Sequence, residues 1–176
     1  YLTVYPAHQE KWRQRLSGLA RPRVGIAWQG NPKHLGDRIR SIPLRQWEPL
    51  LRLPNVTWCS LQRGYGHEQL TQIQNSSLLD LGGELASNFA DGAGLLENLD
   101  LLITVDTSLA HLAGALGKPV WVLLPLNADW RWLRNRPNSP WYPSMRLFRQ
   151  TQRGNWDTVF EEVSKELMLR KHTLKV

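Results

Sequence analysis

Short, mostly apolar runs recur along this chain, and each is followed by a loop and then by a helical pattern. The run at 101–105 reads LLITV, and an apolar run of this kind is typical of a parallel strand buried on both faces. Strands that alternate with helices at this spacing predict an α/β fold, a Rossmann-like doubly wound parallel sheet. We expect strands at 24–28, 56–61, 77–81, 101–105, 119–124 and 145–148, and helices at 8–19, 41–53, 66–74, 89–99, 108–116 and 156–169.

The length of 176 residues suits one domain with a substantial core and flanking segments. We predict a helical segment or interlobe linker at 1–20, a Rossmann-like domain at 21–150, and a C-terminal helix with a basic tail at 151–176. Tyr1 stands where an initiator methionine would be expected, which suggests a fragment of a longer protein.

The sequence carries neither a membrane-span pattern nor a signal-peptide pattern. No apolar run approaches the roughly 18–20 residues that cross a bilayer, and the first residues lack a leader's charged and apolar regions. Cys59 is the only cysteine, so it has no intramolecular disulfide partner, as is usual in a reducing compartment. We therefore expect a cytoplasmic protein.

The formal net charge of +7 raises a polyanion, such as nucleic acid, as a partner. The basic residues, however, lie in the first and last thirds of the chain, and none occurs between residues 64 and 117. That gap covers the middle of the predicted sheet and counts against a continuous basic stripe. A basic nucleic-acid-binding domain stays open as an unfavoured alternative.

The polar and aromatic residues concentrate in the loops that follow the predicted strands. In an open parallel sheet, ligands bind outside the carboxyl ends of the strands. We therefore expect a ligand site among the segments 29–40, 62–65, 82–83, 106–108 and 125–132.

The junction between the run at 101–105 and the next helix carries Asp106, Thr107 and Ser108. Residues of these types often cap helices, and the free N–H groups of a helix N-terminus also bind anions. His111 follows Thr107 by four residues, one turn along the same helix face. The junction can thus cap its helix, bind a phosphate, or do both, and His111 is either a packed histidine or a ligand contact.

Two further loops carry residues suited to a diphosphate ligand. Lys33, Arg38 and Arg40 crowd the loop after the first strand, and arginine forks match phosphate oxygens. The loop at 125–132 holds Asn127, Asp129 and Trp130, and its tryptophans can pack on a base or sugar or on the strand ends. The chain lacks G-x-G-x-x-G after the first strand, Walker A, G-x-S-x-G and Asp-x-Asp patterns, so a metal-free nucleotide diphosphate is the most economical ligand.

Several longer stretches resemble a known family. VGIAWQGNPKHLGDRIRSIPL, DTSLAHLAGALGKPVWVLLP, DWRWL and SPWYPSMRLFRQ resemble bacterial proteins in which tetratricopeptide repeats precede a glycosyltransferase domain. The D-T-x-x-x-H-x-A-x-A-x-x-x-P pattern is similar to that of the heptosyltransferases of glycosyltransferase family nine, and more remotely to the O-GlcNAc transferase catalytic region. The likeness extends from about residue 21 to the end of the chain.

This resemblance implies a two-lobed GT-B glycosyltransferase, inverting and metal-independent, of which this chain is the C-terminal, donor-binding lobe. It implies a nucleotide-diphosphate sugar as donor, no cofactor, and a catalytic base in an N-terminal lobe, with tetratricopeptide repeats as further partners. A non-catalytic nucleotide-sugar-binding module and an epimerase of similar architecture are the alternatives. The implied catalytic residue is His111, and the implied donor-binding residues are Lys33, Arg38, Arg40, Gln62, Asp106, Thr107, Ser108, Asn127, Asp129 and Trp130.

Overall fold

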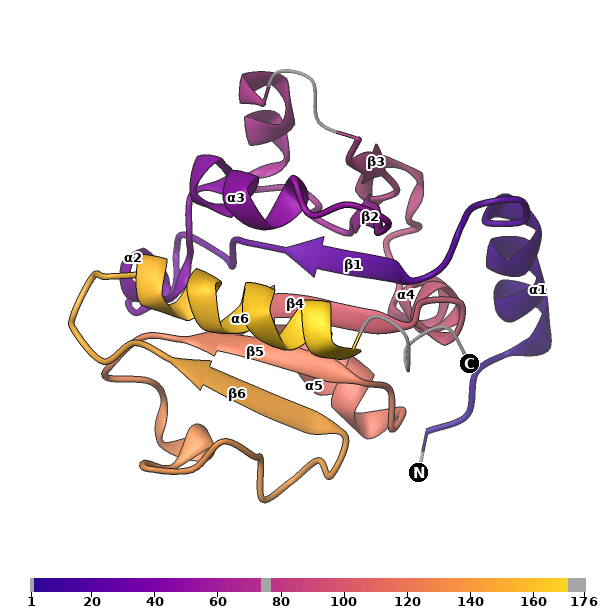
Figure 1. Ribbon diagram of the computed structural model, residues 1–176. Coiled ribbons are helices and arrows are strands. Elements are labelled where there is room, and N and C mark those ends of the chain that lie inside the picture. Colours follow the sequence, from indigo (N-terminus) through magenta and orange to yellow (C-terminus); the bar gives the residue numbers. More distant parts are fainter. Residues whose placement is uncertain (1, 74–76, 171–176) are drawn as a thin grey trace.

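A computed structural model describes residues 2–73 and 77–170, which form a six-stranded sheet between two layers of helices (Figure 1). Neighbouring strands are all parallel, in the order β3-β2-β1-β4-β5-β6. This order confirms the predicted doubly wound α/β sheet. The strands are β1 (Arg23–Ala27), β2 (Thr57–Ser60), β3 (Leu79–Asp80), β4 (Leu101–Val105), β5 (Val120–Leu124) and β6 (Met145–Arg149).

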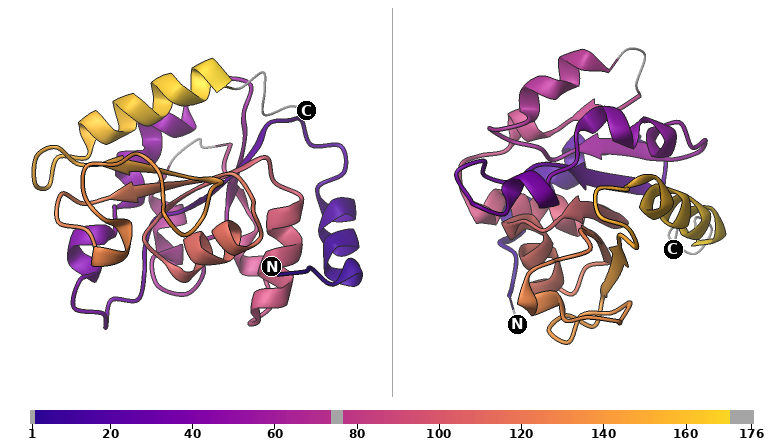
Figure 2. Two further views of the ribbon diagram at one scale, coloured as in Figure 1. Left: turned by 90° about the horizontal axis from the view of Figure 1, so that it is seen from below. Right: turned by 90° about the vertical axis from the view of Figure 1, so that its left-hand side faces the viewer.

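Helices cover both faces of the sheet (Figure 2). One face packs against α3 and α6, and the other against α1, α4 and α5. Within the described residues, no helix is both long enough and apolar enough to cross a membrane. The α-helices are α1 (Pro6–Arg15), α2 (Asp37–Arg40), α3 (Glu48–Leu51), α4 (Phe89–Glu97), α5 (Ser108–Ala115) and α6 (Asp157–Arg170), and the 3-10 turns are η1 (Leu44–Trp47), η2 (His67–Gln72), η3 (Gly82–Glu84) and η4 (Trp130–Trp132).

Alternate side chains of the central strands enter two separate cores. In β4, Ile103 joins the core beneath α3 and α6, while Leu102 joins the core beneath α1, α4 and α5. Both neighbours are fully buried, as the alternation of side chains along a strand between two helical layers requires. These strands are apolar throughout because both of their faces are buried under helices.

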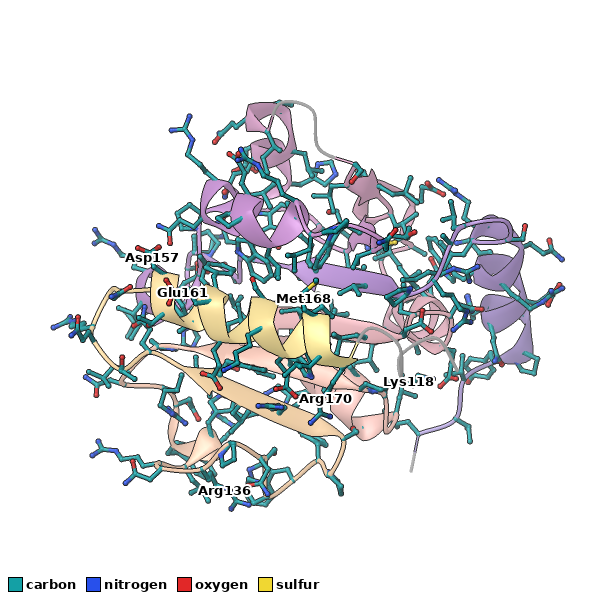
Figure 3. The ribbon with its side chains drawn as sticks, in the orientation of Figure 1. Lys118, Arg136, Asp157, Glu161, Met168 and Arg170 are labelled. Atoms are coloured by element: carbon teal, nitrogen blue, oxygen red, sulfur yellow. The ribbon has the colours of Figure 1, made fainter. Side chains whose placement is uncertain are left out.

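The two helices at the ends of the chain contribute to these cores. Trp12 of α1 is buried against α4, and α6 buries one face against the sheet while charged residues such as Glu161 lie on its outer side (Figure 3). The part of the predicted basic tail at 171–176 lies outside the described residues.

The predicted helix at 41–53 is wrong in its first part. Ser41, which has the residue type of a helix cap, does not cap one: the next helical turn begins only after Pro43, and the Ser41 Oγ accepts a hydrogen bond from the Gly30 N–H at 3.0 Å. The chain instead forms the short helix α2 before Ser41 and then η1 and α3 after Pro43. The segment 66–74 is likewise a 3-10 turn over His67–Gln72 rather than an α-helix, and its last predicted residue, Gln74, lies outside the described residues.

The two edges of the sheet differ in how they end. The β3 edge consists of two residues only. Along the β6 edge, Asn138 forms an isolated antiparallel bridge with Arg146, and the Leu147 N–H donates to the Pro137 carbonyl at 2.7 Å. A short strand therefore limits one edge, and a loop lies along the other.

Candidate functional site

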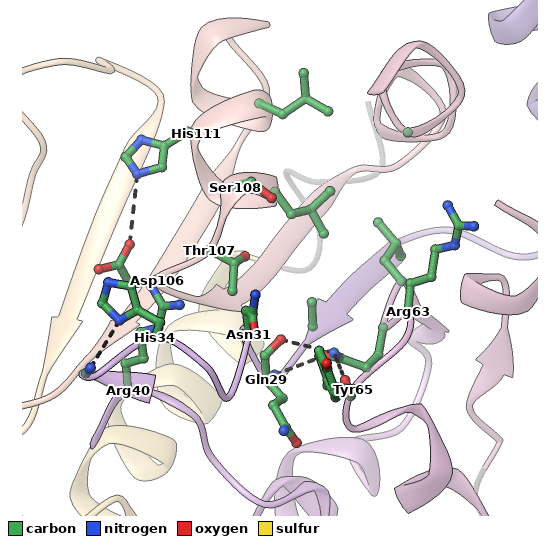
Figure 4. Close-up of a pocket in the computed structure, with 18 of the residues that line it drawn as sticks. Gln29, Asn31, His34, Arg40, Arg63, Tyr65, Asp106, Thr107, Ser108 and His111 are labelled. Carbon is green, nitrogen blue, oxygen red and sulfur yellow. Dashed lines mark hydrogen bonds and ion pairs between the residues drawn. The ribbon is translucent and has the colours of Figure 1, made fainter. Parts of the chain in front are cut away.

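A cavity of about 850 Å³ lies at the carboxyl ends of β1 and β4. These two strands are neighbours at the centre of the sheet, where the strand order reverses direction. Ligands of open α/β sheets bind at this switch point, because the loops on either side diverge there and leave a crevice. The cavity thus lies where the sequence predicts a ligand site (Figure 4).

The N-terminal end of α5 opens on this cavity, since Thr107, Ser108 and Leu109 line it. Thr107 occupies the N-cap position in an extended conformation, yet no side chain makes a capping hydrogen bond there. The side-chain capping interpretation of the junction is therefore wrong. The N-terminus of α5 presents its partial positive charge to the cavity without a protein carboxylate bonded to it.

His111 lines the same cavity one turn further along α5. Its Nε2 lies 3.9 Å from Oδ1 of Asp106, and its Nδ1 lies 3.3 Å from the hydroxyl of Tyr142. Burial lowers the pKa of His111, an effect that the carboxylate of Asp106 only partly opposes. The imidazole is thus neutral near pH 7 and can donate from one ring nitrogen only.

Of the predicted basic residues, Arg40 lines the cavity, while Lys33 and Arg38 are exposed outside it. The Arg40 Nε donates to Oδ1 of the buried Asp37 at 3.2 Å. This ion pair fixes the position of the guanidinium, which lies on the cavity lining. His34 also lines the cavity, from the same loop (Figure 4).

Gln62 is nearly buried, and its amide holds the walls of the cavity together. Its Oε1 accepts from the N–H groups of Trp28 and Gln29 at 2.9 and 3.0 Å. Its Nε2 donates to the carbonyls of Gln29 and Tyr65 at 3.0 and 2.6 Å. The structure places Gln62 at the predicted site with its polar atoms committed to backbone, so it joins the loops after β1 and β2.

The loop after β5 places only part of its predicted residues in the cavity. Asn127 and Asp129 line it, whereas Trp130 is exposed outside it. Asp129 accepts from the Arg131 N–H at 3.0 Å and pairs with its guanidinium at 2.7 Å, and the hydrogen bond from that N–H lowers the pKa of Asp129. Trp132 is fully buried in the core beneath α1, α4 and α5, so this tryptophan packs within the protein and does not line the cavity.

Sequence reasoning missed residues 85–89 of one wall of the cavity, although it predicted the segment 62–65 beside them. The turn before α4 contributes residues 85–89 to it, and Arg63 and Tyr65 complete that side (Figure 4). Phe89 and Tyr65 are exposed by 65% and 50% and both line the cavity, so their rings are accessible to a ligand. Residues 85–89 continue the connection from β3 to the start of α4, so extending the predicted segment 82–83 to that helix would have found this wall.

The side chains that could bind a metal ion or an anion can be compared directly. Across 2–73 and 77–170, no three His, Cys, Asp or Glu side chains gather closely enough to hold a metal ion. The charged groups at the cavity are instead Asp106, Asp129, Arg40, Arg63 and Arg131. They can bind an anion through the arginines, and the carboxylates can accept hydrogen bonds from hydroxyl groups.

Comparison with known proteins gives consistent likenesses. Residues 55–128, which span β2 to the loop after β5, match the profile of Glycosyltransferase family 9 (heptosyltransferase). Protein FlbA of Caulobacter vibrioides is 30% identical over an alignment that covers 95% of this chain and 28% of FlbA. The chain thus spans less than a third of the length of that relative.

Two solved structures share the fold. The E. coli ADP-heptose LPS heptosyltransferase II superposes with a TM-score of 0.66 at 18% identity, over 99% of this chain and 54% of that one. The E. coli heptosyltransferase WaaC with ADP-2-deoxy-2-fluoro heptose superposes with a TM-score of 0.62 at 14% identity, over 94% of this chain and 49% of that one. The chain therefore has the α/β fold of about one half of a GT-B heptosyltransferase, with a central segment similar to glycosyltransferase family 9.

Proposed function

We propose that this chain is the donor-binding lobe of a glycosyltransferase and that a nucleotide-diphosphate sugar binds in the cavity at the switch point. The observation that carries this proposal is the uncapped N-terminus of α5, which opens on the cavity beside His111 and shares it with Arg40. A helix N-terminus and an arginine together suit a diphosphate, because both supply N–H donors with positive charge. The likeness to family 9 supports the same assignment.

We assign two parts of the cavity lining to two parts of such a donor. The diphosphate lies at Thr107 and Ser108 near Arg40, where the N–H groups of α5 and a guanidinium supply donors. The nucleoside lies against the turn before α4, where Leu85 and Phe89 offer apolar surface. We take ADP as the first nucleotide to test, since both E. coli heptosyltransferases named above carry ADP in their descriptions.

The mechanism that we propose is inverting and metal-independent. As the sugar is displaced, charge grows on the leaving diphosphate, and the N–H groups of α5 with Arg40 stabilise it where it develops. His111 donates a hydrogen bond to the same group. The catalytic base and the acceptor site belong to an N-terminal lobe, and tetratricopeptide repeats are the further partners that we propose for the whole protein.

We place this activity in the cytoplasm. The single thiol, Cys59, is free and buried within β2, and burial raises its pKa to about 12. A buried, protonated thiol is inert in either redox compartment. The placement therefore rests on the lack of an intramolecular disulfide partner for this only cysteine.

ADP at about 100 times its Kd is expected to stabilise the chain by roughly 2.7 kcal/mol. In a chain of this size, that gain raises the melting temperature by about 5–10 °C. GDP and UDP, each with and without magnesium, complete the thermal-shift series. A selective, magnesium-independent shift supports the proposal, and no shift with any of the nucleotides contradicts it.

Replacing Arg40 with glutamine is expected to weaken ADP binding by about tenfold or more, because a hydrogen bond to a charged group is lost. The matched control is Arg52→Gln, which removes an exposed arginine that also pairs with an acidic residue one turn away, Glu48. Calorimetric titration gives both affinities. Because Arg40 also pairs with the buried Asp37, the free energy of unfolding is measured in the same samples. An Arg40→Gln affinity within twofold of the wild type would remove this arginine from the site.

A further inference from the structure

The imidazole of His111 packs against two aromatic side chains, Trp132 and Tyr142, neither of which lines the cavity. The ring of Trp132 stacks on the imidazole with a centroid separation of 5.1 Å and an interplanar angle of 21°. The ring of Tyr142 meets it edge-on at 5.8 Å and 64°. Trp132 is fully buried, so its ring leaves the imidazole little freedom to rotate.

The fold makes room for Tyr142 at this position. A Cβ on Gly114 would lie 2.5 Å from the Tyr142 ring, so glycine on α5 lets the ring pass close to the helix. Trp132 is fixed by Arg149, whose Nη2 donates to the carbonyl oxygens of Trp132 and Leu133 at 3.3 and 2.7 Å. The two aromatic rings are thus positioned by contacts outside the cavity.

The two nitrogens of the imidazole face different partners. Nδ1 points away from the cavity to the Tyr142 hydroxyl at 3.3 Å, and Nε2 lies on the side of Asp106, a residue that lines the cavity. The 3.9 Å from Nε2 to the Asp106 carboxylate exceeds a hydrogen bond, so Nε2 is available to a ligand. Figure 4 shows this edge of His111 facing Asp106.

The ring is neutral, which makes the choice of tautomer decisive. Burial lowers the pKa of His111; of the charged groups around it, Asp106 and Asp129 oppose this effect and Arg131 adds to it. A neutral imidazole carries one N–H. A hydroxyl at Nδ1 either donates to the bare nitrogen or accepts from its N–H, so the direction of the Tyr142 hydrogen bond and the tautomer of His111 are set together.

We propose that Tyr142 is a positioning residue whose hydroxyl donates to Nδ1 of His111 and thereby fixes the Nε2–H tautomer, so that His111 presents an N–H donor to the cavity. The identity of the acceptor, a diphosphate oxygen, rests on the proposed function. His111 acts here as a neutral hydrogen-bond donor, and no proton is transferred. The role is the one that a second residue commonly has when it sets the tautomer of a functional histidine.

The test is long-range nitrogen–proton correlation NMR on the 176-residue chain, which reports the protonation of each ring nitrogen of His111. The wild type is expected to show the Nε2–H tautomer near neutral pH. Tyr142→Phe is expected to admit a substantial Nδ1–H population and to weaken ADP binding by about two- to tenfold. Tyr5→Phe, which changes an exposed tyrosine near the chain start, is the matched control and leaves both quantities unchanged.

A second variant keeps the test decisive if Tyr142→Phe fails to fold. Asp106→Asn removes the charge on the other side of the ring, and the Nε2–H tautomer is expected to persist in it. Loss of that tautomer in Asp106→Asn, or its full retention in a folded Tyr142→Phe, overturns the inference. Absence of ADP, GDP and UDP binding in the wild type instead contradicts the proposed function, while the tautomer measurement still decides the role of Tyr142.

Discussion

Replacing Gly82 with alanine is expected to lower the free energy of unfolding by about 3 kcal/mol, the upper end of the usual cost of overpacking. A Cβ at this position would lie 1.9 Å from the carbonyl oxygen of Gln62 and 2.8 Å from its carbonyl carbon. Those atoms are backbone, so no rotation of a side chain relieves the overlap. Chemical denaturation of the variant and the wild type measures the difference.

Gly83→Ala is the matched control, because the next glycine has more space. Its Cβ would meet only the side chains of Asp80 and His67, at 3.3 and 3.8 Å. We expect its stability to stay within about 1 kcal/mol of the wild type. Since Gln62 joins the loops after β1 and β2, we expect a displaced Gln62 in Gly82→Ala to weaken the proposed nucleotide binding as well. Equal stability of the two glycine variants would contradict the close approach at Gly82.

Replacing Asp91 with asparagine is expected to destabilise the fold by about 3 kcal/mol or more. The Asp91 carboxylate is completely buried at the start of α4, where it accepts from Trp12 Nε1 and twice from Lys11 Nζ at 2.9 Å each, and from the Ala86 N–H at 2.8 Å. An asparagine amide offers one acceptor oxygen in place of two and turns a donor toward another donor. The free energy of unfolding from chemical denaturation measures the loss.

The control for this substitution is Asp80→Asn. Asp80 also forms an ion pair, with His67 at 2.9 Å, but both side chains are more than a third exposed. An exposed pair contributes about 0–1 kcal/mol, so this variant should lose little. Losses of the same size in both variants would mean that the burial of Asp91 does not set its contribution.

The carboxylate of Asp91 also makes the free energy of unfolding depend on pH in the acid range. Burial raises the pKa of Asp91, but the hydrogen bonds from Ala86, Lys11, Trp12 and His8 together lower it further, to about 2 from an ordinary value of 3.8. A lowered folded-state pKa adds stability that is present above about pH 4 and is lost as the pH falls toward 2. The shift corresponds to about 2 kcal/mol. Asp91→Asn should lack this acid-dependent part, which denaturation at a series of pH values measures.

The sequence predicts best those elements whose pattern is set by burial on both sides. The run at 101–105 and the helix from Ser108 occur nearly as expected. The run is short and contains β-branched residues, and Gly117 and Pro119 end the Ala/Leu-rich helix. The segment 41–53 is different. Ser41 has the residue type of a helix cap, but Gly30, eleven positions earlier, supplies the N–H that its hydroxyl accepts. A local pattern cannot reveal that competition.

Of the predicted site residues, the structure likewise places some on the cavity lining and others outside it. The strand-end rule brings Arg40, Asp106 and His111 to one cavity, since the topology of the sheet fixes where these loops meet. The rule does not say which side chains of a loop turn inward, so Lys33, Arg38 and Trp130 lie outside the cavity lining. Tyr142 lies 31 residues after His111, and the packing of its ring against Gly114 helps to bring the two together.

The two edges of the sheet constrain how copies of this chain can associate. A strand from another molecule adds to a sheet only where a run of backbone N–H and C=O groups is long and unobstructed. The two residues of β3 offer too short a run, and the loop at Pro137 and Asn138 lies along β6. Copies of this fold would therefore associate through side-chain surfaces. Extension of the sheet from one molecule to the next, which is the first step toward cross-β aggregates, is disfavoured at both sheet edges.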